Sequence, residues 1–376
     1  MLKIKSIFAV ILLLIFLYLI ISSSSCNDDN PVIPPPPPVT VDTSDQYLWR
    51  LCGVGPELHQ SYVADTNRIY LFYGGQNVFV YSGGSYGDTL HPVIFANSQF
   101  FAVNALNSPS GNTCFLGGNL KNNRFYPAIE KMQNGIFTET YEASSDTSNS
   151  AFMAMTFEDE NNAWLTMGSG CNSFYHFSSG SFKEYKIDTN FIGISIFNLN
   201  NIIYLFGSRK INSNPNNYDI AFSSYIFRDN NFELLSTDTM INQGGFLSTL
   251  INKTTDNNLI LSGPNDLKYF NGTRWKHLAP NPFINGEVVW ELCGYSKDSL
   301  LTLGSFPKGF AVGKWNGINW KAENSTYYLL RHVQFVMYGP NLNSRILRDK
   351  VYFMIPNRFN STILIGQKKN KLKKLN

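Results

Sequence analysis

Few residues in this chain have the type and spacing that catalysis or metal binding needs. The five histidines lie far apart, and no two of them have the spacing of metal ligands: His59, His91, His176, His277 and His332. The chain also lacks the His-Glu-x-x-His and Gly-x-Ser-x-Gly motifs, a phosphate-binding loop and a dinucleotide-binding fingerprint. The sequence therefore predicts no local set of catalytic residues, no metal site and no cofactor.

One cluster of carboxylates could attract a hard cation. Glu158, Asp159 and Glu160 follow one another in "FEDENN", and calcium prefers oxygen ligands of this kind. The cluster lacks the glycine and the alternate-residue spacing of a calcium loop. We therefore interpret it as a polar turn between two strands.

The longest polar connection spans residues 207–220, "GSRKINSNPNNYDI". Arg209, Lys210, Asn217 and Tyr218 in this segment could contact an acidic or sugar-like partner. A solvated insertion without a partner explains so polar a loop equally well. These four are the candidate binding residues.

The N-terminal region has the pattern of an export signal, which we place at residues 1–25. Lys3 and Lys5 precede an apolar run of fifteen residues, 7–21, which is shorter than the roughly 20 residues of a membrane-spanning helix. The following "SSSSC" resembles a bacterial lipobox, and this resemblance implies that Cys26 is lipidated. The usual leucine three residues before the cysteine is replaced by a serine, so cleavage without lipidation and an uncleaved anchor stay open.

Residues 26–45 have the composition of a tether. Pro34 to Pro38 cannot donate backbone hydrogen bonds and favour a stiff polyproline II spacer. We expect a lipoprotein of the bacterial outer membrane, attached to the membrane through its N-terminal lipid. The stretch "CNDDN" resembles the signal for cell-surface display, which stays open beside a periplasmic location.

Residues 46–376 form the folded part, and the chain after Lys5 carries little net charge. Without Lys3 and Lys5, 28 basic residues face 27 acidic ones, a formal charge of 28 − 27 = +1. This balance gives no reason to expect a nucleic-acid partner. We interpret the basic C-terminal "KKNKLKKLN" as a last strand and tail, with contact to an anionic surface as the second alternative. We expect a monomer.

Four cysteines follow Cys26, and three pairings among them are possible. Cys52, Cys114 and Cys293 lie in apolar, strand-like runs, where a cysteine is usually a small buried hydrophobe. The sequence does not decide whether these residues or Cys171 form disulfides.

A recurring pair of large apolar residues, five positions apart, organises the whole chain. The pairs are Tyr81 and Tyr86, Met132 and Phe137, Phe177 and Phe182, Phe227 and Phe232, Phe270 and Trp275, and Trp315 and Trp320. They enclose segments such as "QNGI" and "NGTR", whose Asn-Gly and Ser-Gly steps suit tight hairpin turns. With such turns, Met132 should face Phe137 directly, whereas Phe270 should lie diagonal to Trp275.

The full repeat is visible in residues 151–188. It reads as four strands in up-and-down order, "FMAMTFED", "AWLTMGSG", "NSFYHFSSG" and "SFKEYKID", and the copies recur every 43 to 51 residues. Such a period predicts an all-β fold, a seven-bladed β-propeller of four-stranded antiparallel blades whose turn-flanking rings fill the space between blades. A pair of β-sandwiches would not repeat one turn motif at one period.

One similarity between two segments of the chain, which we call the echo, fits the seven-blade scheme less directly. "LWRLCG" at 48–53 resembles "VWELCG" at 289–294 but lies far from the next strand of blade one. Either blade one has a long insertion, or the echo belongs to an extra closing strand.

The repeat unit resembles the blades of exported bacterial propellers of the two-component-regulator and photosystem-assembly-factor types. The resemblance covers the folded part through turn-level motifs. It implies the fold and no particular ligand.

The fold leads us to expect a non-enzymatic binding or scaffold protein that contacts a protein or glycan through one face. The alternative is a carbohydrate-active lyase or hydrolase whose catalytic residues come from several blades at the channel mouth. A weaker third possibility is the sensor part of a signalling system.

Overall fold

The computed structural model describes most of the chain after its N-terminal region. The described residues are 46–55, 60–66, 68–73, 77–82, 89–144, 150–167, 172–187, 191–210, 220–240, 250–262, 266–282, 291–331, 344–355 and 361–369. The chain divides into two compact units, Met1–Val41 and Asp42–Asn376, and all described residues lie in the second. The predicted signal peptide, Cys26 and the tether therefore lie outside the described residues.

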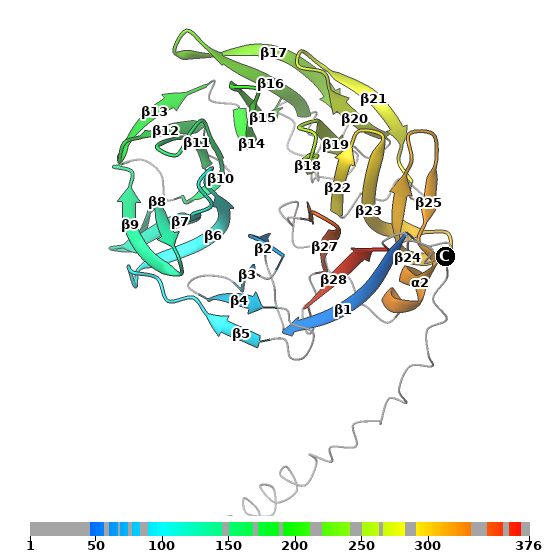
Figure 1. Ribbon diagram of the computed structural model, residues 1–376. Helices are drawn as coiled ribbons and strands as arrows, with labels where there is room; N and C mark the ends of the chain where they lie inside the picture. The colour runs from blue at the N-terminus through cyan, green and yellow to red at the C-terminus, as the bar shows by residue number, and fades with distance from the viewer. Residues whose placement is uncertain are drawn as a thin grey trace, which may run out of the picture. The chain divides into compact units, whose positions relative to one another are not determined.

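The second unit is a ring of seven four-stranded antiparallel sheets, as predicted (Figure 1). Blade one contains β2 (Gln60–Val63), β3 (Ile69–Phe72), β4 (Val78–Ser82) and β5 (Thr89–Pro92). Blade two contains β6 (Phe100–Asn107), β7 (Thr113–Lys121), β8 (Arg124–Gln133) and β9 (Ile136–Glu142). Blade three contains β10 (Phe152–Phe157), β11 (Asn162–Met167), β12 (Ser173–Ser178) and β13 (Ser181–Lys186).

The remaining blades follow the same order from the channel outward. Blade four contains β14 (Phe191–Leu199), β15 (Ile202–Lys210), β16 (Ile220–Arg228) and β17 (Asn231–Met240). Blade five contains β18 (Leu250–Lys253), β19 (Leu259–Ser262), β20 (Asp266–Phe270) and β21 (Trp275–Pro280). Blade six contains β22 (Glu291–Ser296), β23 (Ser299–Phe306), β24 (Gly309–Trp315) and β25 (Trp320–Ala322), followed by the helix α2 (Asn324–Leu330). No helix among the described residues has the length and hydropathy of a membrane-spanning segment.

Blade seven joins the two ends of the ring. It contains β26 (Arg345–Leu347), β27 (Lys350–Ile355), β28 (Ser361–Lys368) and, as its outermost strand, β1 (Tyr47–Gly55). The "LWRLCG" echo therefore belongs to a closing strand, and the alternative of a long insertion in blade one is wrong. The prediction that the C-terminal segment supplies the last strand is also wrong, because β1 pairs with β28 from Tyr47↔Lys368 onward and occupies that edge.

Two-residue turns connect several of the outer hairpins. Met132 pairs with Phe137 across Asn134 and Gly135, whose φ angles of 52° and 81° lie in the left-handed region. Asn and Gly adopt this region at the lowest cost, and a tight hairpin needs it at both central residues. The register predicted for this pair is confirmed.

The "NGTR" hairpin is different from our expectation. Phe270 lies directly opposite Trp275, not diagonal to it. The side-chain oxygen of Asn271 accepts hydrogen bonds from the amides of Thr273 (3.1 Å) and Arg274 (2.9 Å), so the turn holds four residues instead of two. An asparagine that bonds to its own turn in this way lengthens the loop and restores direct pairing.

The paired aromatic residues fill the joints between blades, as predicted. Phe270 and Trp275 of blade five pack against Tyr204, Phe206 and Phe222 of blade four. The ring centroids of Phe206 and Phe270 are 5.2 Å apart at an angle of 86°, an edge-to-face contact. For Tyr81 the structure shows pairing with Leu90, and Tyr86 lies outside the described residues.

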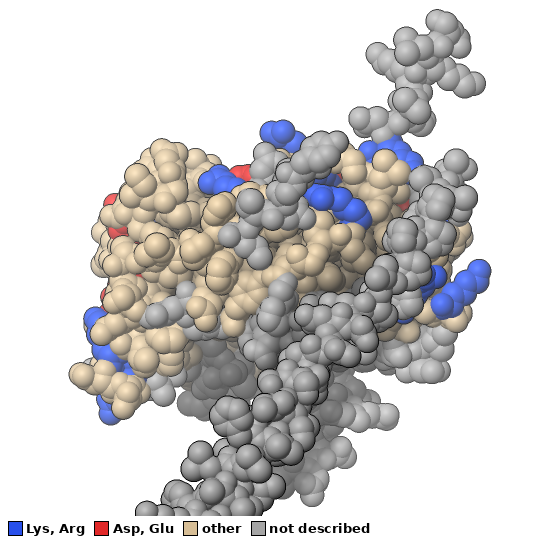
Figure 2. Space-filling model, turned by 90° about the horizontal axis from the view of Figure 1, so that it is seen from below, with Lys and Arg blue, Asp and Glu red and all other residues tan. Residues whose placement is uncertain are grey.

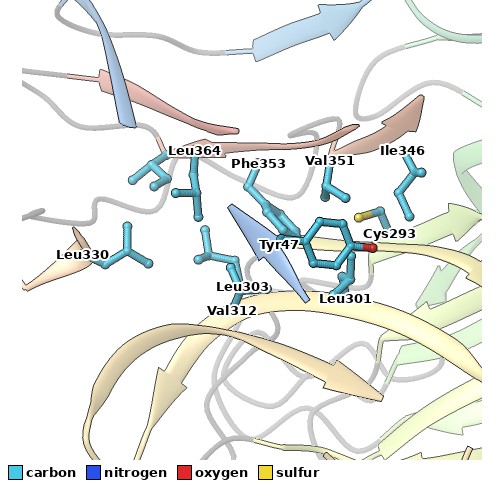
Figure 3. Packing of buried hydrophobic residues seen from close by; sticks show 11 residues of the cluster. Tyr47, Cys293, Leu301, Leu303, Val312, Leu330, Ile346, Val351, Phe353 and Leu364 are labelled. Carbon is cyan, nitrogen blue, oxygen red and sulfur yellow. The ribbon is translucent and has the colours of Figure 1, made fainter. Parts of the chain in front are cut away.

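The joints on either side of blade seven are packed mainly by aliphatic residues. Figure 3 shows the joint between blades six and seven, where Tyr47 and Phe353 lie among leucine, valine and isoleucine side chains. The joint between blades seven and one is similar and includes Cys52, Val54 and Ile363. Closure of the ring thus uses smaller side chains than the aromatic joint between blades four and five.

Glu323, just before α2, fastens the start of the closing strand. Its carboxylate accepts hydrogen bonds from the backbone amides of Gln46 (3.1 Å) and Tyr47 (3.4 Å) and from the indole N–H of Trp49 (3.2 Å). Hydrogen bonds to a carboxylate are stronger than those between neutral groups. Glu323 thereby links blade six to the strand that completes blade seven.

Candidate ligand-binding face

The up-and-down strand order sorts the loops onto two faces of the ring. With the strands of each blade named A to D from the channel outward, the B–C and D–A loops must lie on one face and the A–B and C–D loops on the other. The A strands surround the channel (Figure 1). Ligand-binding residues of such folds usually lie on loops that a rigid scaffold positions, so the B–C/D–A face is the first candidate.

Polar side chains of the A strands bind the neighbouring blades. The side-chain amides of Asn104 and Asn198 donate to the carbonyl oxygens of Met153 (3.0 Å) and Phe157 (2.9 Å), respectively, in blade three. In the same way, Asn252 donates to Leu292 and Arg345 donates to Val63. These groups therefore hold the blades together around the channel.

Glu291 is the only acidic residue within the bounds of the seven A strands. It is fully buried at the start of β22, where burial raises the pKa of its carboxyl to about 8 although the Ser344 amide donates a hydrogen bond to it. One carboxylate oxygen accepts the Ser344 amide at 2.9 Å, and the other has no partner among the described residues. Burial also raises the pKa of the Cys293 thiol two residues on.

The described A strands hold no pair of carboxyl groups. Glycoside hydrolysis usually needs two carboxyl groups facing one bond, and the described A strands carry one, enclosed in protein. The described residues also hold no group of His, Cys, Asp or Glu placed to bind a metal ion. Our sequence interpretation missed Glu291, whose only signal was a charge inside the apolar run "VWELCG".

The three carboxylates of "FEDENN" lie on the opposite face, in the A–B turn of blade three. Asp159 accepts hydrogen bonds from the amides of Asn161 (2.8 Å) and Asn162 (3.0 Å), as expected of a polar turn. Glu158 accepts from the Trp164 indole (3.0 Å) and lies 3.1 Å from the His176 imidazole. These bonds stabilise the turn and the blade beside it.

Glu160 reaches from this turn to blade two. Its carboxylate accepts hydrogen bonds from the Ser108 hydroxyl and the Ser110 amide, both at 3.0 Å. Desolvation alone would raise its pKa, but the hydrogen bonds from Ser110, Ser108 and Asn112 outweigh this effect and lower the pKa to about 2. Glu160 is therefore an inter-blade bridge.

The structure describes the backbone of two of the four predicted binding residues. Arg209 and Lys210 lie at the end of β15, with their backbones paired to Ala221 and Ile220, so they are on the B–C/D–A face. Their side chains, and Asn217 and Tyr218 entirely, lie outside what the structure describes.

Blade two contributes a second projecting feature to this face. The segment 117–125 is mostly paired strand with a two-residue turn at Asn122 and Asn123, whose φ angles are 50° and 59°. Lys121 and Arg124 flank this turn and are exposed. Asparagine tolerates the left-handed region, which explains why "KNNR" makes a hairpin tip.

The two remaining histidines that the structure describes lie in different blades. His277 lies 3.0 Å from Asp266 in blade five, and His91 is exposed on β5. His59 and His332 are outside the described residues. Cys52, Cys114 and Cys293 are buried, as expected, and Cys171 is outside the described residues.

Comparison with known proteins shows similarity in structure only. No protein-family model matches the chain, and no curated protein matches it. The structure of YCF48 from Cyanidioschyzon merolae is 10% identical, with a TM-score of 0.55 over 86% of this chain and 99% of that one. YCF48 bound to a D1 peptide is 9% identical, with a TM-score of 0.54 over 87% of this chain and 100% of that one.

A chain of the mitotic checkpoint complex is similar to the same extent. It is 8% identical, with a TM-score of 0.54 over 85% of this chain and 94% of that one. At such low identity the likeness concerns the fold alone. The protein is thus a seven-bladed β-propeller with the architecture of YCF48, a photosystem assembly factor, in line with the resemblance in its repeats.

Proposed function

We propose that this protein is a non-enzymatic binding or scaffold protein that holds a partner protein on its B–C/D–A face. The observation that carries the proposal is the construction of the channel wall. Its described polar side chains bind neighbouring blades, and Glu291, its single carboxyl, is enclosed. We therefore assign ligand binding to the loops of the B–C/D–A face.

The hairpins of this face favour a macromolecular partner. β7 and β8 have nine and ten residues, against six each for β11 and β12 in the neighbouring blade. Blade four has a similarly long pair, nine residues each in β15 and β16. Raised hairpins on both sides of blade three suit an extended partner, and YCF48, a propeller of similar fold, has been solved with a D1 peptide bound.

We also propose that Cys26 carries a lipid that attaches the ring to the outer membrane through the tether. The support is the export signal and lipobox-like sequence ahead of "PPPPP". A Cys26→Ser variant should appear in the soluble fraction of cells, while the parent protein stays with the membranes and incorporates a labelled fatty acid. A parent protein without incorporated label would contradict lipidation.

Partner binding is tested with two matched charge variants. Arg124→Glu with Lys308→Glu alters the B–C turns of blades two and six, whereas Lys321→Glu with Lys350→Glu alters the opposite face. After cross-linking in cells, the first variant should lose the partner and the second should keep it. Equal capture by both variants, or turnover of a glycan by the purified ring, would contradict the proposal.

A further inference from the structure

The two ends of the ring meet at one corner of the A–B/C–D face. Tyr47, the first residue of β1, pairs with Lys368, the last residue of β28. Next to this pair, the Lys369 amide donates a hydrogen bond to the Gln46 carbonyl at 3.0 Å. The predicted tether therefore continues from this corner.

Basic residues gather around the same corner, at the ends of blades six and seven that form the A–B/C–D face. We call this set the closure patch: Lys297, Lys314, Lys321, Arg348, Lys350, Lys368 and Lys369. In Figure 2 basic side chains project at the right-hand end, the side on which β24 and the start of β1 lie in Figure 1, and others project at the left-hand end and along the upper side.

Three acidic residues lie within this region, and each has a local partner. Asp298 is 2.6 Å from the Lys297 amine, Asp349 accepts a hydrogen bond from Gln367, and Glu323 holds the amides of β1. Seven basic and three acidic residues leave 7 − 3 = +4.

The closure patch contains like charges in direct opposition. Lys314 and Lys321 are cross-strand partners on β24 and β25. Such a pair is destabilising unless an anion or an acceptor lies nearby. Lys314 donates to the side-chain oxygen of Gln46, and Lys321 is exposed.

An exposed apolar residue lies beside these charges. Ile318, in the C–D turn "WNGINW" of blade six, is 83% exposed. A basic surface with a protruding apolar side chain is typical of protein segments that lie at a membrane interface.

The same face has the opposite charge on the other side of the ring. In blades two and three it carries Lys131 and Lys183 against Glu139, Glu158, Asp159 and Glu160, which leaves 2 − 4 = −2. The positive charge is therefore a local property of the closure corner and not of the face as a whole.

We propose that the closure patch binds the headgroups of anionic phospholipids and holds this corner of the ring on the membrane. Among anionic partners, lipid is favoured because the patch surrounds the point where the chain continues into the predicted lipid-anchored tether. A basic surface adds electrostatic attraction to a membrane that contains anionic lipids. In this orientation the B–C/D–A face points away from the bilayer. The proposed function does not itself require this orientation.

The test uses a chain that starts at Asp42, without signal, Cys26 or proline run. This chain contains all seven blades and the β1–β28 closure, and the described contacts involve no residue before Gln46. It should sediment with vesicles of phosphatidylglycerol and phosphatidylcholine but not with pure phosphatidylcholine. Binding should weaken strongly in 0.5 M salt, because salt screens exposed charges.

Lys321→Gln with Lys350→Gln should weaken vesicle binding about 25-fold, since each basic residue at an anionic surface contributes about a fivefold change in affinity. Arg124→Gln with Lys308→Gln, on the B–C/D–A face, should leave it unchanged. Unfolding curves establish that both variants are folded. Absent binding, binding to neutral vesicles, or equal loss in both variants would overturn the proposal. The cross-linking outcome above is independent, because the chain tested here needs no partner.

Discussion

The joints between blades two, three and four and the joints around blade seven solve one packing problem differently. Along the continuous chain, large rings fill the space, as where the Trp164 and Phe227 ring centroids lie 4.4 Å apart. Around blade seven, aliphatic side chains fill it, and Glu323 adds hydrogen bonds to β1. Directional contacts occur in both regions, through Glu160 between blades two and three and through Glu323 at β1, so the regions differ in the side chains that fill the joints.

The two regions also treat buried or bridging carboxyls in opposite ways. Glu160, between blades two and three, is stabilised in its charged form by hydrogen bonds from blade two. Glu291, beside blade seven, lies where burial favours its neutral form. A glutamate thus stabilises the joint between blades two and three at neutral pH, whereas another glutamate destabilises the joint beside blade seven at high pH.

The largest effect should come from removing the closing strand. A chain beginning at residue 56 loses β1, including buried Tyr47, Cys52 and Val54, and leaves the edge of β28 unpaired. We expect a loss of more than about 5 kcal/mol in the free energy of unfolding, enough to abolish cooperative unfolding. A chain beginning at Asp42 is the control. Equal denaturant midpoints for the two chains would show that closure by β1 contributes nothing.

Trp164→Ala tests the aromatic joints. Trp164 is 1% exposed and contacts Phe227 and Phe232 across the joint of blades three and four, and Tyr185 within blade three. Truncation of a fully buried tryptophan typically costs about 3–5 kcal/mol. Trp320→Ala, at a partly exposed ring, should cost clearly less in the same urea titration. A larger loss of unfolding free energy for Trp320→Ala would contradict the prediction that the joint of blades three and four is the more important one.

Glu291→Gln should change the pH dependence of stability on the closure side. Because the folded pKa is raised to about 8 from the ordinary 4.5, the folded protein holds this proton more tightly than the unfolded chain. Stability is then greatest below pH 4.5 and falls as pH rises to 8. The variant should lack this fall and unfold at a higher temperature than the parent at pH 8.5. Parallel melting curves from pH 5 to pH 8.5 would contradict the assignment.

Glu160→Gln should have the smallest effect and the opposite sign. The folded pKa of about 2 lies below the ordinary 4.5, so this group stabilises the protein above pH 4.5 and loses that contribution as pH falls to 2. We expect the variant to be less stable by about 1 kcal/mol at pH 7, because the bridge is partly solvated. The difference should shrink towards pH 2, which acid titration of unfolding can measure. A constant difference would show that ionisation is not its cause.

The sequence alone was sufficient for the repeat, the four-strand order and the position of the aromatic pairs. These features depend on residues within one blade, where turn chemistry and alternation act over a few positions. The structure puts the backbones of Arg209 and Lys210 at the end of β15, and their role in binding stays a prediction. Local reasoning failed for the "NGTR" turn, where one side-chain hydrogen bond changed the loop length.

Only the tertiary structure decided which strand closes the ring and which carboxyl is buried. β1 and β28 are separated by almost the whole chain, and no local pattern specifies their pairing. The role of Glu323 depends on residues 274 to 277 positions away, and that of Glu291 on its enclosure. Strand propensity and turn type are local properties, whereas burial and charge environment are created when distant blades meet.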